Sequence, residues 1–172
     1  GPFVCCRLHG DLLGAVVTRW DEMRARRTYL TGALGSRHAG EAFGDAWELP
    51  PDRAYAETCA AIGSVMLAWR LLLATGEERF ADAIERALFN AVLPGISPDG
   101  TAFFYVNPLQ VRPGGTGYGG GEVRGRRPWY ACACCPPNLM RTFASLEGLL
   151  ATTDSEGIRI HQPAAATVDT EV

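Results

Sequence analysis

Apolar residues recur at helical spacing in several stretches of this chain, and polar residues fill the opposite faces. The first stretch predicts a helix over about residues 12–26. The strongest pattern covers residues 62–73 and ends at Gly76, which suits the left-handed C-cap of a helix. Acidic residues open a further helix over residues 77–92, which is predicted to form a helical hairpin with the preceding one. Residues 31–41 show no sustained period, which is typical of an active-site loop or lid.

The second half of the chain mixes both kinds of pattern. Aromatic and β-branched residues predict an extended segment over residues 101–111, followed by a glycine-rich, mobile loop at 114–121. Prolines at 136–137 suit the first turn of a helix that continues to about Thr152. Residues 157–161 alternate as a strand does. We therefore expect a mainly α fold in which long loops build a site at one end of the helices.

Length, composition and charge indicate which kinds of binding partner this chain is expected to have. The chain has 172 residues, is 47% hydrophobic and carries a formal net charge of −3. That length suffices for the core of one domain without disulfide bonds. The negative charge argues against a nucleic-acid or anionic-membrane partner, because both need a dominant basic surface. No run of about 18 or more apolar residues is present, so we expect no membrane-spanning segment and favour small neutral ligands.

The cysteines are placed unlike those of a secreted disulfide framework. Three of the six crowd into Cys132-Ala133-Cys134-Cys135, and adjacent cysteines rarely bridge each other. The N-terminus also lacks the pattern of a secretory signal. We therefore expect reduced thiols in a cytoplasmic compartment, or a metal site.

Two pairs of residues at helix entrances are the strongest candidates for chemistry. Cys134 and Cys135 directly precede a predicted helix, whose first-turn N–H groups favour thiolates. Glu57 and Cys59 precede the longest helix pattern, and at an extended helix entrance both can turn toward one ion. Zinc accepts both sulfur and carboxylate oxygen. Because the spacing is not that of a zinc finger, buried core cysteines and a helix N-terminal glutamate remain the alternative interpretation.

Several strings of residues together resemble a known family. In chain order they are Arg27-Thr28-Tyr29-Leu30-Thr31-Gly32, Gly40-Glu41-Ala42-Phe43-Gly44, Tyr55-Ala56-Glu57-Thr58-Cys59-Ala60, Phe104-Tyr105-Val106-Asn107-Pro108-Leu109 and Cys132-Ala133-Cys134-Cys135-Pro136-Pro137-Asn138. They resemble the β-L-arabinofuranosidases of glycoside hydrolase family 127 over roughly residues 12–162. An ordered set of motifs is far more specific than any one of them.

The resemblance implies a fold and a division of the chain. Residues 12–155 are expected to form part of an (α/α)6 catalytic barrel, and residues 156–172 the start of a β-sandwich domain or a linker. Residues 1–11 match nothing expected of the family and form an atypical N-terminal segment. We therefore expect the chain to carry only part of the barrel.

The resemblance also implies a retaining enzyme that releases terminal β-L-arabinofuranose from small or oligomeric substrates. The family's zinc ligands fall on Glu57, Cys59, Cys134 and Cys135, and its nucleophile falls on Cys134. Its general acid/base falls on Glu41. A tyrosine near the sugar matches Tyr105. His38 is interpreted either as a residue that lines the pocket or as an exposed loop histidine.

Other hypotheses remain open at this stage. A bound zinc ion could activate water, with Glu41 as general base. A closed set of four protein ligands could instead hold a purely structural zinc in a binding module. Cys132 and Cys135 have the C-x-x-C spacing of redox proteins, but no βαβ pattern surrounds them. A homo-oligomer is compatible with the sequence, and the sugar and linkage depend on the shape of the pocket.

Overall fold

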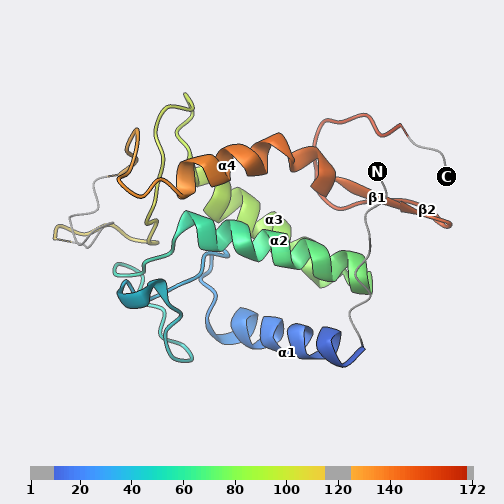
Figure 1. Cartoon of the computed structure of the whole chain (residues 1–172), viewed down its shortest axis with the longest axis horizontal. Helices are drawn as coiled ribbons and strands as arrows, with labels where there is room; N and C mark the ends of the chain where they lie inside the picture. The colour runs from blue at the N-terminus through green and yellow to red at the C-terminus, as the bar shows by residue number, and fades with distance from the viewer. Residues whose placement is uncertain (1–9, 115–124, 170–172) are drawn as a thin grey trace.

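The computed structural model describes residues 10–114 and 125–169 and shows a mainly helical chain with one small hairpin (Figure 1). The atypical segment up to residue 9 and most of the glycine-rich loop predicted at 114–121 lie outside the described residues. The α-helices are α1 (Gly10–Arg26), α2 (Thr58–Thr75), α3 (Glu78–Ala87) and α4 (Cys135–Ala144). Shorter elements are the 3-10 turns η1 (Ala39–Glu41), η3 (Leu93–Gly95) and η5 (Leu146–Leu149), the π-helical turn η2 (Leu88–Val92) and the strands β1 (Ala151–Asp154) and β2 (Gly157–Ile160).

The core lies between α2 and its neighbours. The helical hairpin of α2 and α3 is confirmed, and Gly76 ends α2 in the left-handed conformation (φ 71°) with its N–H bonded to the Leu72 carbonyl oxygen. Ile62 from α2 and Phe80 from α3 are fully buried. Trp20 of α1 packs against Phe80 with 5.9 Å between ring centroids. The apolar stripes read from the sequence therefore face one another.

Helix α2 is long and apolar. Within the part of the chain that the structure describes, it is long and apolar enough to cross a membrane by length and composition alone. Its residues Ala61, Ile62, Val65, Ala68 and Leu71 are buried against the rest of the chain. Apolar side chains buried against the rest of the chain are typical of a helix in a protein core.

The end of the last helix differs from the prediction. Helix α4 ends at Ala144, and Ser145 leaves the helical region (φ −116°, ψ 10°), so a helix to Thr152 is wrong. Thr152 instead pairs with Arg159 in the antiparallel ladder between β1 and β2. The β-branched side chains of this region fit the pleat of a strand better than the last turn of a helix.

The extended segment predicted at 101–111 contains no ladder of its own. Phe103 makes isolated bridges with Ile96 and Arg127, and Val106 makes one with Glu57. These single contacts tie the segment to three different parts of the chain. The segment is therefore extended, and its backbone groups are shared among loops.

The arrangement brings the long loops together. In Figure 1 the loops that follow α1 and α3 gather at one end of the helices, where α2 and α4 begin, and the hairpin of β1 and β2 lies at the opposite end. The mainly α class is confirmed, together with a two-stranded sheet near the C-terminus. Assembly into an (α/α)6 barrel stays a prediction.

Candidate metal centre and active site

The four candidate ligands meet at two helix N-termini. Glu57 immediately precedes α2 and Cys59 lies in its first turn, while Cys134 immediately precedes α4 and Cys135 begins it. One ligand atom from each residue lies within 4.8 Å of all the others. The Sγ atoms of Cys59 and Cys135 are 3.4 Å apart, and Cys134 Sγ lies 3.4 Å from Glu57 Oε1. The predicted set is therefore brought together from positions 77 residues apart in the chain.

Backbone conformation explains how Glu57 and Cys59 share a site. Glu57 is extended (φ −64°, ψ 135°), so its side chain turns back toward the helix entrance instead of pointing away as i and i+2 do within a helix. Ala56 before it has a positive φ of 40°. Strained backbone of this kind clusters at functional sites. The N-terminal ends of α2 and α4 also place partial positive charge near the thiols, and this charge favours the ionised forms.

The extended segment after η3 carries Tyr105 to the same place. The Thr58 N–H donates to the Tyr105 carbonyl oxygen (3.0 Å), and the Thr58 hydroxyl donates to the Phe104 carbonyl oxygen (2.9 Å). These bonds fix the segment beside the first turn of α2. As a result the Tyr105 hydroxyl lies 3.0 Å from Cys134 Sγ.

The donor set fits a metal ion. A hydrogen bond with Cys135 lowers the pKa of the Cys59 thiol to about 7, whereas burial raises the pKa of Cys134 to about 12. The pKa of Cys135 is also raised, first by its hydrogen bond with Cys59 and then by burial. The protein atoms alone thus support one thiolate among three thiols. A bound cation removes that restriction, because a coordinating thiol is deprotonated.

Cys132 lies outside this group. It is exposed, whereas Cys135 is buried and has Cys59, Cys134 and Glu57 as its neighbours. The geometry therefore gives no support to a redox pair of Cys132 and Cys135.

Glu41 stands in a tight turn next to this centre. The backbone groups of Arg37 and Ala42 pair in both directions at 3.1 Å, which closes residues 38–41 into a turn. Glu41 has a left-handed backbone (φ 49°) and an exposed side chain, and its Oε1 accepts a 2.7 Å hydrogen bond from the hydroxyl of the buried Tyr55. The Tyr55 and Tyr105 rings meet edge to face with 6.1 Å between centroids. Glu41 and Cys134 are therefore held by two tyrosines that contact each other.

His38 lies in the same turn and is half-buried. Its ring meets Tyr55 edge to face at 4.9 Å, and burial lowers its pKa. Among the described residues its Nε2 atom is buried without a hydrogen-bond partner. The histidine is thus placed beside the residue that holds Glu41.

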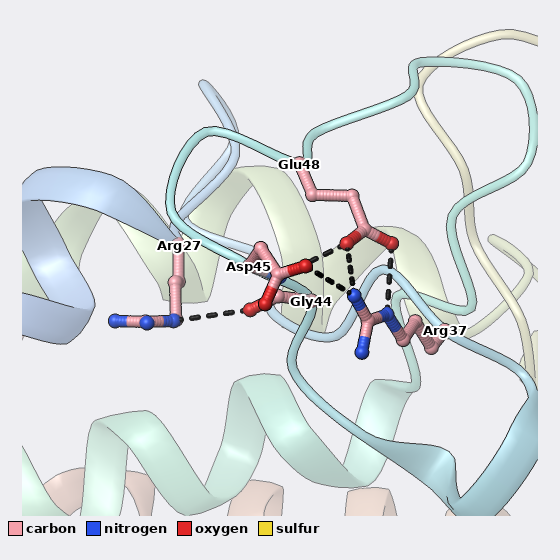
Figure 2. Close-up of polar contacts among 5 residues, drawn as sticks. All are labelled: Arg27, Arg37, Gly44, Asp45 and Glu48. Atoms are coloured by element: carbon pink, nitrogen blue, oxygen red, sulfur yellow. Dashed lines mark hydrogen bonds and ion pairs between the residues drawn. The ribbon is translucent and has the colours of Figure 1, made fainter.

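Ion pairs at the base of the turn join Arg37 to two residues that follow the turn in the same loop (Figure 2). Arg37 Nε donates to Glu48 Oε1 at 2.9 Å, and its Nη2 donates to Glu48 Oε2 at 2.5 Å and to Asp45 Oδ2 at 2.8 Å. Arg27, the residue directly after α1, donates through Nε to the Gly44 carbonyl oxygen at 3.1 Å and so ties this loop to the end of the helix. The bidentate geometry orients the loop that presents Glu41.

Sequence reasoning did not single out Arg37 or Tyr55 as functional residues. Tyr55 lies two positions before Glu57 within one of the quoted strings, which was the available signal. No pattern in the sequence pointed to Arg37, because its partners are brought to it only when the loop folds.

The chain is similar in sequence to known glycoside hydrolases. A sequence profile of the GH127 β-L-arabinofuranosidase catalytic domain matches residues 10–148. The chain belongs to glycoside hydrolase family 127. A non-reducing end β-L-arabinofuranosidase from Bifidobacterium longum subsp. longum is 37% identical over 169 residues, which are 95% of this chain and 26% of that protein.

Solved family 127 structures are also similar. A β-L-arabinofuranosidase from Geobacillus stearothermophilus T6 matches with a TM-score of 0.83 and 39% identity over 90% of this chain and 25% of its own. Another GH127 β-arabinofuranosidase matches with a TM-score of 0.79 and 39% identity, over 88% of this chain and 22% of its own. The chain therefore spans about a quarter of the length of these family 127 relatives.

Proposed function

We propose that this segment carries the catalytic centre of a retaining glycoside hydrolase that releases terminal β-L-arabinofuranose. Two similar proteins named above are β-L-arabinofuranosidases, and this supports the choice of sugar. The observation that supports the chemistry is a pair of tyrosines whose rings are in contact. Tyr55 bonds Glu41, and Tyr105 contacts Cys134.

Zinc is the metal proposed for the centre. Three thiolates and one carboxylate complete the tetrahedral shell that zinc prefers in proteins. Glu57, Cys59, Cys134 and Cys135 would hold it. When bound, the ion supplies positive charge that keeps the thiols ionised at neutral pH.

The first half of the reaction uses Cys134 and Glu41. The sulfur of Cys134 attacks the anomeric carbon, and the bond from that carbon to the leaving oxygen breaks. Glu41 gives its proton to the leaving oxygen as general acid. A thioglycosyl bond to Cys134 results, and Glu41 is left as a carboxylate.

The second half reverses these roles. Glu41 takes a proton from water, whose oxygen attacks the anomeric carbon, and the carbon–sulfur bond breaks to return the thiolate of Cys134. Two displacements at one carbon retain its configuration. The Tyr105 hydroxyl, 3.0 Å from the sulfur, donates to the departing thiolate. Tyr105 and His38 would also line the sugar site.

Sulfur is the nucleophile that this geometry favours over a second carboxylate. Most retaining glycosidases pair two carboxylates about 5 Å apart. Here the carboxylate beside Cys134 is Glu57, whose Oε1 lies 3.4 Å from Cys134 Sγ and 3.6 Å from Cys135 Sγ. Glu57 is thus committed to the metal set, where it balances charge.

Trapping the thioglycosyl bond tests the proposal. The variant Glu41→Gln lacks the general base of the second half, whereas an aryl β-L-arabinofuranoside with a good leaving group still reacts in the first half. Intact-mass and peptide analysis should find one pentosyl group on Cys134. An enzyme that turns over without any adduct would support metal-activated water instead.

A structural role for the metal is the competing function, because four protein ligands are typical of closed, structural zinc sites. Under that hypothesis Glu41→Gln leaves function intact. The glycosidase proposal requires turnover of substrates with poor leaving groups to collapse in the same variant.

A further inference from the structure

The hydroxyl of Tyr130 holds the backbone of the segment that carries Tyr105. It donates to the Phe103 carbonyl oxygen at 2.7 Å and accepts from the Tyr105 N–H at 3.1 Å. In extended backbone a carbonyl and the N–H two residues later face the same side, so one hydroxyl bonds both as a neighbouring strand would. Tyr130 is buried, so little water competes for either bond. This side chain therefore replaces part of the ladder that the segment lacks.

The rings of Tyr130 and Tyr105 are also in contact. They meet edge to face with 5.3 Å between centroids, a geometry that stabilises aromatic pairs. The Tyr105 ring is buried and contacts the Tyr55 ring as well, at 6.1 Å. Backbone and ring of Tyr105 are thus both held by Tyr130, while its hydroxyl lies 3.0 Å from Cys134 Sγ.

Tyr130 also belongs to the stretch of chain that leads to the nucleophile. This stretch runs from Arg127 to Cys134, which immediately precedes α4. At its start, the N–H and carbonyl of Arg127 pair with those of Phe103, each at 2.8 Å. A residue on the way to the sulfur therefore fixes the backbone of the residue whose hydroxyl contacts that sulfur.

We propose that Tyr130 is a positioning residue that sets the Tyr105 hydroxyl against Cys134 for the half of the reaction in which the carbon–sulfur bond breaks. A hydroxyl bonds a charged thiolate more strongly than the neutral sulfur of a thioglycoside. The bond therefore helps where negative charge returns to sulfur, and it gives no help where sulfur attacks and loses its charge. This inference rests on the proposed function, because it concerns the same nucleophile.

The variant Tyr130→Phe tests this role through the balance between the two halves of the reaction. It keeps the ring and removes the hydroxyl. With an aryl β-L-arabinofuranoside that has a good leaving group, kcat reports the second half and kcat/KM reports the first. We expect kcat to fall about tenfold, as loss of a hydrogen bond to a charged group does, with KM falling in proportion and kcat/KM nearly unchanged. An unchanged kcat, or a lower kcat with constant KM, would overturn the proposal.

A double-variant cycle shows whether Tyr130 acts through Tyr105. If it does, Tyr130→Phe should change kcat little once Tyr105→Phe has removed the hydroxyl that it positions. Losses that multiply in the double variant would show that Tyr130 acts by another route, and this would also overturn the proposal.

Tyr29→Phe is the matched control. Tyr29 is buried as Tyr130 is, but its hydroxyl has no hydrogen-bond partner among the described residues. The same chemical change should therefore leave both kcat and KM unaltered.

Hydrogen exchange tests the two bonds without metal, substrate or turnover. The Tyr105 N–H donates to Tyr130, so it should exchange slowly in the unaltered chain and in Tyr29→Phe, and about tenfold faster or more in Tyr130→Phe. Fast exchange of this N–H in the unaltered chain would refute the bond itself. That measurement remains decisive even if Tyr130→Phe fails to fold.

The two failures are distinct. An unaltered chain that neither turns over arabinofuranosides nor forms an adduct on Cys134 would refute the proposed function, and with it this role for Tyr130. Turnover through a Cys134 adduct, with kcat and exchange of the Tyr105 N–H both unchanged in Tyr130→Phe, would refute the role of Tyr130 alone.

Discussion

Replacing Gly44 by alanine places a methyl group where the loop that carries Glu41 has no room. A Cβ atom there would lie 2.3 Å from Ser36 Oγ and 2.5 Å from Glu48 Cδ. Real Cβ atoms do not approach other atoms within 3.0 Å, so the buried Ser36 side chain and the Glu48 carboxylate both have to move. The Glu48 carboxylate is the far end of a flexible side chain, so the cost of moving it comes from disturbing its bidentate bonds with Arg37 (Figure 2).

The expected loss follows from this crowding. Overpacking of a filled site costs about 1–3 kcal/mol. For a domain of this size each kcal/mol lowers the melting temperature by about 2–4 °C. Displacing Glu41 by about 1 Å would also lower activity by on the order of a hundredfold. Gly44→Ala is therefore expected to reduce turnover more than its melting temperature alone would suggest.

Gly14→Ala is the matched control for this substitution. Gly14 lies within α1, where a Cβ atom would meet nothing within 4 Å, so alanine should stabilise the helix by about 0.5–1 kcal/mol. Differential scanning calorimetry of both variants checks the opposite signs. A melting temperature for Gly44→Ala equal to or above that of the unaltered chain would refute the steric argument.

Three further outcomes are expected. Leu139 is fully buried one turn after Cys135, so Leu139→Ala should lower the free energy of unfolding by about 2–5 kcal/mol in urea denaturation. The ion pair with Arg37 lowers the pKa of Glu48 from 4.5 to about 2, so the protection that the pair gives the loop should be complete above about pH 4.5 and lost as the pH falls through about 2. Limited proteolysis, compared between the unaltered chain and Arg37→Met, measures that difference, with an acid-active protease at low pH and thermolysin at neutral pH. Tyr105→Phe removes the hydroxyl 3.0 Å from Cys134, and we expect slower turnover of β-L-arabinofuranosides with unchanged zinc stoichiometry.

Each of these three predictions has either a control variant or an outcome that would contradict it. Met140→Ala changes the exposed neighbour of Leu139 and should leave unfolding nearly unchanged. Equal proteolysis of the unaltered chain and Arg37→Met at neutral pH would show that the ion pairs do not hold the loop. Loss of zinc in Tyr105→Phe would mean that the hydroxyl supports the metal set and has no separate role in the reaction.

The site unites residues from the entrances of two helices, and this has a chemical consequence. Both helix dipoles and a bound cation act in the same direction on the thiols, toward ionisation. The sulfur nucleophile that we propose would therefore need no neighbouring base at neutral pH. In the proposed reaction, Glu41 is therefore free to serve as acid in one half and as base in the other.

The sequence by itself determined the local features. Helical periodicity and Gly76 located α2 and its end, because the left-handed cap depends on residue type at one position. The order of helix, prolines and thiols likewise placed Cys134 and Cys135 at the start of α4. The end of α4 was misjudged, since leucines at helical spacing continue into η5 and outweighed the preference of threonine for the following strand.

Tertiary structure alone decided what surrounds these features. The contact of Glu57 with Cys134 spans 77 positions, and no local pattern encodes such a distance. The bond from Tyr55 to Glu41 likewise depends on how a loop closes. The contact between Cys59 and Cys135 depends on how the starts of α2 and α4 are placed side by side. A sequence shows which groups are able to bind a metal or move a proton. Their partners are set by packing between segments, because hydrogen bonds and metal coordination act over a few ångströms in space whatever the separation along the chain.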